Sequence, residues 1–195
     1  LHFDKQKKRT QDDSLQTAAD NLDIFYLATK LKFCCEIVNR KNWVAADYEL
    51  KFLTQIQNYL EHSPHKDIPA ISIYHNILMG LLDPDTESYF QNLKTLLAEN
   101  VNTFPQKEAK DVFSYAVNYC IHKINKGNKE YLTELFGIYS QMIEQEIIYE
   151  KGWLSPWSFK NIVSVACRVK NYDWAESFIK NYNIIIDKLL FFLLL

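Results

Sequence analysis

The chain has 195 residues, which is long enough for one domain with a sizeable buried core. It is 48% hydrophobic and 24% charged with only 4 Gly and 5 Pro, a composition that argues against a β-rich or linker-rich protein and favours helices joined by short loops. The net charge of −2 gives no overall basic field, so we do not expect general nucleic-acid binding.

The two ends of the chain differ in character. Residues 1–19 mix charges without a helical period, and we expect a polar, poorly ordered lead-in there. Residues 184–195 are apolar apart from Asp187 and Lys188, but this run is too short to span a hydrocarbon layer of about 30 Å. We interpret it as the start of a further helix that is truncated here, with membrane attachment or a sequence artefact as alternatives.

Between residues 20 and 183, apolar residues recur at spacings of three and four, which is typical of helices with one buried face. The pattern predicts eight helices in four antiparallel pairs. The first pair covers about residues 20–61, with the polar break 39–42 between its helices and a returning helix that starts near Ala45. A short helix over 68–82, apolar nearly all round, opens the second pair, and the turn 83–86 leads into its partner.

The third and fourth pairs carry clearer start and stop signals. A helix restarts at Phe104-Pro105, ends before the turn Lys126-Gly127-Asn128, and is followed by a helix over about 131–143. Ser155 before Pro156 predicts a capped helix start, because Pro at the first helical position loses no hydrogen bond. The polar break 170–171 then separates this helix from the last one.

The stretch NYDWAESFIKNY, residues 171–182, resembles the second helix of a tetratricopeptide-type repeat. Tyr172 stands at the turn, and Ala175 stands at the close helix crossing. Val163 replaces the family's small residue in the first helix, Ala166 replaces the usual aromatic, and no Pro closes the unit. Over residues 20–183 the chain is similar to uncharacterised bacterial helical-repeat proteins with SPW and YDWAE-like segments, a resemblance that implies a fold without an activity.

An Asn recurs in the middle of three first helices. Asn76, Asn118 and Asn161 are 42 and 43 residues apart, each with an aromatic residue two or three places before it. This period is longer than the tetratricopeptide period of about 34 residues and closer to that of longer two-helix units. We therefore predict an all-α fold, an α-α superhelix in the form of a right-handed solenoid of about four antiparallel helix hairpins, with one concave face.

Residue types with catalytic or metal-binding chemistry have simpler explanations. His62 and His65 are only two potential metal ligands, Cys120 lies on an apolar stripe apart from His122, and acidic pairs such as Glu144 and Glu146 fit a solvated face. The sequence contains no phosphate-binding Gly loop, nucleophile elbow or zinc-protease motif. We expect no enzyme activity, no metal and no cofactor.

The four cysteines fall in apolar helical stretches: Cys34, Cys35, Cys120 and Cys167. Buried, unpaired thiols are typical of a reducing compartment, so we expect a cytoplasmic protein.

The predicted function is a protein-protein interaction module or assembly scaffold, which binds a peptide or protein on its concave face. The Asn side chains can clamp a peptide backbone through paired donor and acceptor groups. Alternatively, they bond to neighbouring helices and hold the repeats in register. The predicted partner-contacting residues are Tyr74, Asn76, Tyr115, Asn118, Tyr119, His122, Lys160, Asn161, Ser164 and Arg168.

Two other functional classes remain open. One is a regulatory or sensor domain of a larger enzyme or transcription regulator, whose active part lies outside these residues. The other is an RNA-binding helical repeat, which needs a positive stripe along the first helices. Only Lys30, Lys32, Lys160 and Arg168 point that way.

Overall fold

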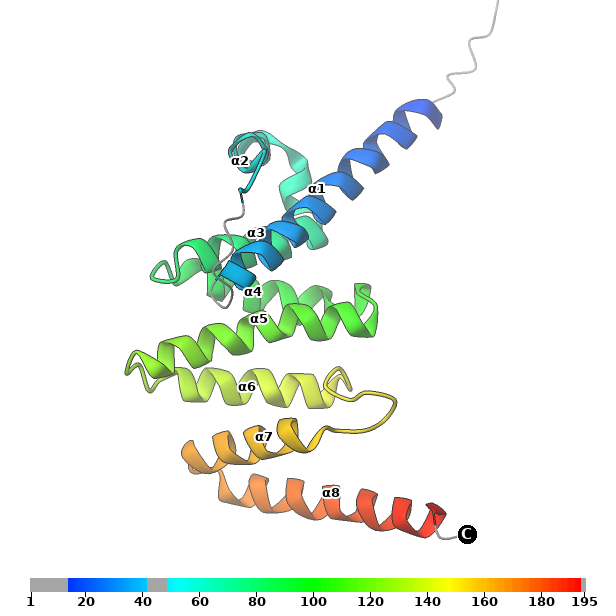
Figure 1. Cartoon of the computed structure of the whole chain (residues 1–195), viewed down its shortest axis with the longest axis vertical. Helices are drawn as coiled ribbons and strands as arrows, with labels where there is room; N and C mark the ends of the chain where they lie inside the picture. The colour runs from blue at the N-terminus through cyan, green and yellow to red at the C-terminus, as the bar shows by residue number, and fades with distance from the viewer. Residues whose placement is uncertain (1–13, 42–48, 194–195) are drawn as a thin grey trace, which may run out of the picture. The chain divides into compact units, whose positions relative to one another are not determined.

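The computed structural model describes residues 14–41 and 49–193 (Figure 1). These residues form helices joined by short loops, and the one β-type pairing among them is an isolated bridge between Glu150 and Trp153. The prediction of an all-α chain is therefore confirmed. The α-helices are α1 (Ser14–Lys41), α2 (Leu53–His62), α3 (Pro69–Leu82), α4 (Ser88–Asn100), α5 (Gln106–Asn125), α6 (Tyr131–Glu144), α7 (Pro156–Arg168) and α8 (Tyr172–Leu193); two short 3-10 helices are η1 (Pro64–Asp67) and η2 (Val101–Thr103).

The helices group into two compact units. Unit 1 ends at Asp83 and contains α1 to α3, and unit 2 begins at Pro84 and contains α4 to α8. The junction coincides with the predicted turn at residues 83–86. One continuous repeat domain over residues 20–183, wound as a right-handed solenoid of four hairpins, stays a prediction.

In unit 1, α1 packs along α3. The buried side chains of α1 begin only at Leu27 and recur along one face to Val38. Near the middle of this contact, the Cys35 thiol donates a hydrogen bond to the carbonyl oxygen of Tyr74, 3.3 Å away. As its apolar sequence predicted, α3 is buried on several sides, and its fully buried side chains include Ile71, Ile73 and Leu78.

The pairing in unit 1 differs from the prediction. The sequence pattern paired the first helix with the one that follows it, whereas α1 packs mainly against α3, and α2 contacts η1. The predicted start of the returning helix near Ala45 lies outside the described residues. The described helix α2 begins at Leu53, after Phe52 adopts a left-handed backbone with φ 65°. That turn redirects the chain just before α2.

In unit 2, each helix from α4 to α8 packs against the next, so the chain runs as an antiparallel zigzag (Figure 1). Its core is built from side chains that the helical periodicity had marked as apolar stripes. The fully buried ones include Val112, Phe113 and Ala116 of α5, Leu97 of α4 and Ile162 and Ala166 of α7. Ala175, at the predicted close crossing, is also buried.

Several local signals are confirmed. The Ser155 hydroxyl accepts a hydrogen bond from the Ser158 backbone N–H at 3.0 Å, and Pro156 is the first residue of α7. Gly127 has φ 101° just after α5, a left-handed conformation that Gly adopts without steric cost. Lys170, with φ 62°, makes the tight turn between α7 and α8.

The two predicted terminal boundaries are shifted. Helix α1 begins at Ser14, so residues 14–19 of the predicted lead-in are helical, and residues 1–13 lie outside the described residues. Helix α8 runs without a break from Tyr172 to Leu193. The predicted separate helix over 184–195 is thus continuous with the last helix through Leu193, because nothing in residues 183–184 interrupts the helical backbone.

Candidate functional site

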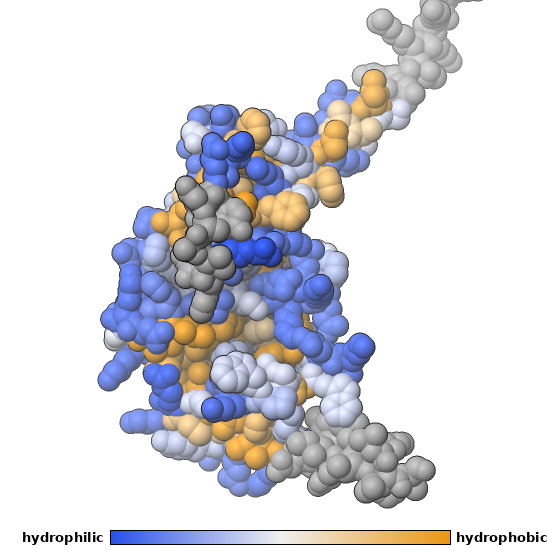
Figure 2. Space-filling view, in the orientation of Figure 1, coloured by the Kyte–Doolittle hydropathy of each residue, from blue (hydrophilic) through white to orange (hydrophobic). Residues whose placement is uncertain are grey.

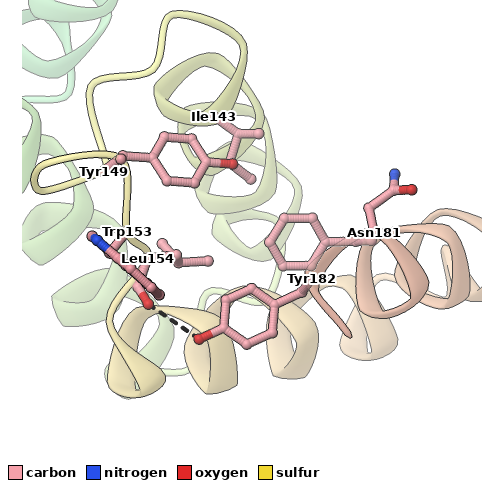
Figure 3. Close-up of a pocket in the computed structure, with 8 residues that line it drawn as sticks. Ile143, Tyr149, Trp153, Leu154, Asn181 and Tyr182 are labelled. Carbon is pink, nitrogen blue, oxygen red and sulfur yellow. Dashed lines mark hydrogen bonds between the residues drawn. The ribbon is translucent and has the colours of Figure 1, made fainter. Parts of the chain in front are cut away.

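A small aromatic pocket lies in unit 2, between the loop that precedes α7 and the middle of α8 (Figure 3). Its volume is about 170 Å³. Tyr149 and Trp153 project from the loop, while Asn181 and Tyr182 come from α8 on the other side (Figure 3). The lining residues are Ile143, Tyr149, Gly152, Trp153, Leu154, Phe178, Asn181 and Tyr182.

The loop wall of the pocket is held in a defined conformation. Glu150 and Trp153 exchange two backbone hydrogen bonds of 2.8 and 2.9 Å, which close a tight turn around Gly152. Gly152 has φ 83°, a conformation that suits Gly. On either side of the turn, Ile148 and Leu154 are buried and anchor the loop to the unit. Contacts within the chain therefore hold this wall of the pocket in place.

Helix α5 also holds this loop in place through two side chains. The side-chain amide of Gln106 donates to the carbonyl oxygens of Glu146 and Tyr149, at 3.1 and 3.2 Å. The ammonium of Lys110 pairs with the carboxylate of Glu150. These contacts bind the loop to the first two turns of a helix that contributes no side chain to the pocket.

The α8 wall belongs to a row of aromatic rings. Tyr182 stacks on Phe159 of α7 with 4.2 Å between ring centroids, and its hydroxyl donates to the Leu154 carbonyl oxygen at 3.1 Å. Nearer the N-terminus of α8, Phe178 stacks on Trp174 with 5.0 Å between ring centroids. Aromatic contacts of this kind add to the hydrophobic stabilisation of the two helices. They also orient the Tyr182 and Phe178 side chains that line the pocket.

The pocket presents ring surfaces and a few polar groups. Trp153 is 48% exposed, so part of this residue is accessible from solvent. Burial, followed by the negative charge of Glu146, raises the pKa of Tyr149. Asn181 is exposed and offers an amide donor and acceptor. This arrangement suits an apolar or aromatic group that carries one hydrogen-bonding atom.

Half of the sequence-predicted contact residues are exposed, and all of these belong to unit 2. Asn118 and His122 lie one turn apart on α5, and Lys160, Ser164 and Arg168 follow one another along α7. The α7 residues are four apart, so they share one face of the helix with each other. Figure 2 shows polar side chains beside hydrophobic ones on the face of unit 2 that it presents.

The other predicted contact residues are less accessible. In unit 1, Tyr74 and Asn76 are buried, and the Asn76 amide donates to the Ser72 carbonyl oxygen of its own helix at 2.9 Å. In unit 2, three residues are half-buried: Tyr115, Tyr119 and Asn161. The three Asn residues of the predicted ladder thus occupy three different environments, buried, exposed and half-buried.

Tyr119 belongs to a cluster that surrounds a buried cation. The side chain of Lys123 is only 5% exposed, and its Nζ lies 3.4 Å from the Glu87 carboxylate. The same Nζ lies 5.5 Å from the Tyr119 ring centroid and 5.8 Å from that of Tyr131. Because a buried charge is costly unless it is paired, these contacts explain how Lys123 is tolerated inside unit 2.

The sequence patterns did not single out Lys123 or the pocket. Lys123 is a charged residue on the apolar face of α5, but only the fold brings Glu87 and Tyr131 to it. For the pocket, the one local signal is Gly152-Trp153, a turn-forming Gly next to a large aromatic residue in a loop.

The other residues with reactive side chains have ordinary environments. Cys34, Cys35 and Cys120 are buried, in agreement with the predicted core thiols, whereas Cys167 is exposed on α7. The Nδ1 of His65 is hydrogen-bonded to the Tyr59 hydroxyl at 2.9 Å. Within the described ranges, no group of three or more His, Cys, Asp or Glu side chains is placed to hold a metal ion.

No protein-family model, curated protein or solved structure matches this chain. The resemblance to tetratricopeptide repeats therefore stays a prediction. Among the helices of residues 14–41 and 49–193, none combines the length and the hydrophobicity needed to cross a membrane.

Proposed function

We propose that this chain is a helical-repeat protein-interaction module, which binds a peptide or protein segment and anchors one of its side chains in the aromatic pocket of unit 2. The observation that carries this proposal is the pocket itself, with its fixed loop wall and its half-exposed Trp153. Aromatic side chains of this kind dominate the binding energy of protein interfaces.

The size of the pocket favours a single side chain as its occupant. Pockets for drug-sized ligands and cofactors usually enclose roughly 300–1,000 Å³. The volume here is about 170 Å³, which is too small for most cofactors. A Leu, Met, Pro or aromatic side chain is the right size, and the Asn181 amide can bond to the peptide group next to it.

Exposed polar residues on α5 and α7 extend the proposed contact beyond the pocket. Trp157, Lys160, Ser164 and Arg168 lie at spacings of three and four along α7. This stripe starts three residues after the pocket residue Leu154. With Asn118 and His122 of α5, these side chains supply hydrogen-bond donors for the carbonyl groups of an extended segment.

The proposal is tested by selection from a phage-displayed random peptide library on the full chain. We expect the enriched peptides to share one large apolar residue. Trp153→Ala should weaken their binding, measured by isothermal titration calorimetry, by about thirtyfold, because truncation of an interface anchor costs about 2 kcal/mol.

The matched control is Tyr172→Ala. Tyr172 is an exposed aromatic residue of the same helix as Tyr182, but ten residues, or about 15 Å, away from it along the helix axis. Peptide affinity should be unchanged in this variant. Equal affinities for wild type and Trp153→Ala, or a selection without a shared apolar residue, would contradict the proposal.

RNA binding is a second candidate, because one observation favours it. The Nζ of Lys160 lies 5.9 Å from the ring centroid of the exposed Trp157, and Arg168 is exposed on the same helix. Cations beside an exposed ring can hold a stacked base. Saturable, salt-dependent binding of a labelled oligouridine, lost in Trp157→Ala and kept in Trp153→Ala, would favour this function over peptide binding.

A further inference from the structure

The carboxyl end of α6 adjoins the aromatic pocket. Ile143, in the last turn of α6, lines the pocket, and Figure 3 shows the Tyr149 ring extending toward it. Glu144 follows Ile143 directly, and the backbone N–H of Glu146 donates to the Ile143 carbonyl oxygen at 3.0 Å. Both glutamates are exposed. We call Glu144 and Glu146 the acidic rim of the pocket.

Backbone hydrogen bonds fix the position of Glu146 beside the pocket. Its carbonyl oxygen accepts from the side-chain amide of Gln106 at 3.1 Å, and the N–H of the next residue, Ile147, donates to the Met142 carbonyl oxygen at 2.9 Å. Glu146 has φ 57°, the left-handed conformation that is usually taken by Gly at such a helix end. A charged residue is therefore held at a position where helix geometry alone favours Gly.

The described residues leave the negative charge of the acidic rim uncompensated. The C-terminus of a helix carries a partial negative charge, so carboxylates there are unfavourable and cations are favourable. The last turn of α6 contains no basic residue, and neither Glu144 nor Glu146 forms an ion pair with a described residue. The field of the rim reaches the pocket, because the charge of Glu146 adds to burial in raising the pKa of the lining residue Tyr149.

Most of the other charges near the pocket are paired. Glu150 of the loop pairs with Lys110 of α5, and Glu176 pairs with Lys180 within α8. Among the described residues, the one unpaired cation of this loop is Lys151, in the turn around the pocket glycine. The balance of unpaired charge beside the pocket is therefore negative, and the two carboxylates lie together at the end of α6.

We propose that the segment bound by the aromatic pocket carries a Lys or Arg next to its apolar anchor, and that this cation pairs with the acidic rim. The inference rests on the proposed peptide binding and adds the charge of the partner to it. Consecutive residues of an extended chain are about 3.5 Å apart, so a residue one or two places from an anchor beside Ile143 reaches the end of α6. A cation there is attracted by two carboxylates and by the helix end, whereas an acidic residue is repelled.

The peptides selected on the full chain test this inference separately from the proposed function. We expect their shared apolar residue to be flanked, within two positions on one side, by Lys or Arg. A shared apolar residue without a basic neighbour would overturn the inference and leave the proposed function standing. A selection without a shared apolar residue would contradict both.

Glu146→Gln removes one charge of the acidic rim and keeps the size of the side chain. Its affinity for a selected basic peptide, measured by isothermal titration calorimetry at low salt, should fall about two- to fivefold, as expected for an exposed ion pair. With Glu144→Gln added, the salt dependence of binding should also decrease. The matched control is Glu99→Gln, at an exposed position of α4, which should bind like wild type. Equal affinity and equal salt dependence of wild type and the double variant would sink the inference.

Charge reversal distinguishes ion pairing from a change in the shape of the loop. Glu146→Lys should weaken binding of the basic peptide by about five- to tenfold and should prefer the same peptide with its basic residue replaced by Glu. The urea midpoint of this variant should not fall, because a cation at the C-terminus of a helix is favourable. If wild type and Glu146→Lys preferred the basic peptide to the same degree, the cation would not pair with the acidic rim and the inference would be wrong.

Discussion

The hydroxyl of Tyr182 donates a hydrogen bond to the carbonyl oxygen of Leu154, 3.1 Å away, and so joins α8 to the loop that precedes α7 (Figure 3). Both residues line the aromatic pocket. One bond therefore contributes to the stability of unit 2 and to the shape of its proposed binding site.

Replacing Tyr182 with Phe removes this donor and keeps the ring. We expect the free energy of unfolding, measured in urea, to fall by about 1 kcal/mol, the usual net contribution of one hydrogen bond. Affinity for a selected peptide should fall as well, because the loop wall is released. Tyr172→Phe, at an exposed position of the same helix, should change the free energy of unfolding by less than about 0.5 kcal/mol. Equal effects of the two variants would contradict the assigned role of Tyr182.

The Asn residues of the predicted ladder should respond differently to substitution. Asn76→Ala removes a buried amide that donates to the Ser72 carbonyl oxygen, so we expect a loss of about 1 kcal/mol in the free energy of unfolding. Asn118 is exposed, so Asn118→Ala should cost less than about 0.5 kcal/mol and show its effect, as a clamp residue, in peptide affinity. If Asn118→Ala proved as destabilising as Asn76→Ala, the register explanation would be favoured instead.

The four thiols should react in two classes. Cys167 is exposed, whereas Cys34, Cys35 and Cys120 are buried. Burial, with the charge of Glu134 added, raises the pKa of Cys120 to about 12, and burial also raises the pKa values of Cys34 and Cys35. Ellman's reagent at neutral pH should therefore modify one thiol rapidly in the folded chain and all four in urea. The rapid phase should vanish in Cys167→Ser, and its persistence there would show that a buried thiol is accessible.

Acid should destabilise unit 2 partly through Glu87. Hydrogen bonds from Tyr131 and then from Lys123 lower the pKa of Glu87 below its ordinary value of 4.5. A carboxylate with a lowered folded-state pKa stabilises the fold above the unfolded pKa, and this contribution is lost as the pH falls through the folded pKa. The urea concentration at the unfolding midpoint of wild type should thus decrease as the pH drops below about 4.5. In Glu87→Gln this decrease should be less steep. Glu99→Gln, at an exposed position of α4, should follow the wild-type curve.

Helix starts and stops were predictable because their signals are local. Ser155-Pro156 caps α7, and Gly127 follows the end of α5 in a left-handed conformation, as their neighbours in sequence indicated. The partner of each helix was less predictable. Periodicity shows that α1 has an apolar face, but the same stripe fits α2 or α3, and the structure packs it on α3.

The candidate site was harder to predict because it joins segments far apart in sequence. Tyr149 and Trp153 come from a loop, while Asn181 and Tyr182 lie about thirty residues later on α8. An equal period in sequence also did not give the three Asn residues equal surroundings, since the neighbours of each helix decide which face is covered. Cys167 is exposed for the same reason: it lies on the face of α7 that no neighbouring helix of the described residues covers.

Gln106 donates to two carbonyl oxygens of the loop that carries Tyr149, yet it is not one of the residues that line the pocket. We therefore expect that the selectivity of the proposed peptide-binding pocket can be changed by residues that do not line it. A substitution at the start of α5 would loosen the loop and admit a larger or differently shaped side chain, with every surface that meets the ligand left chemically intact.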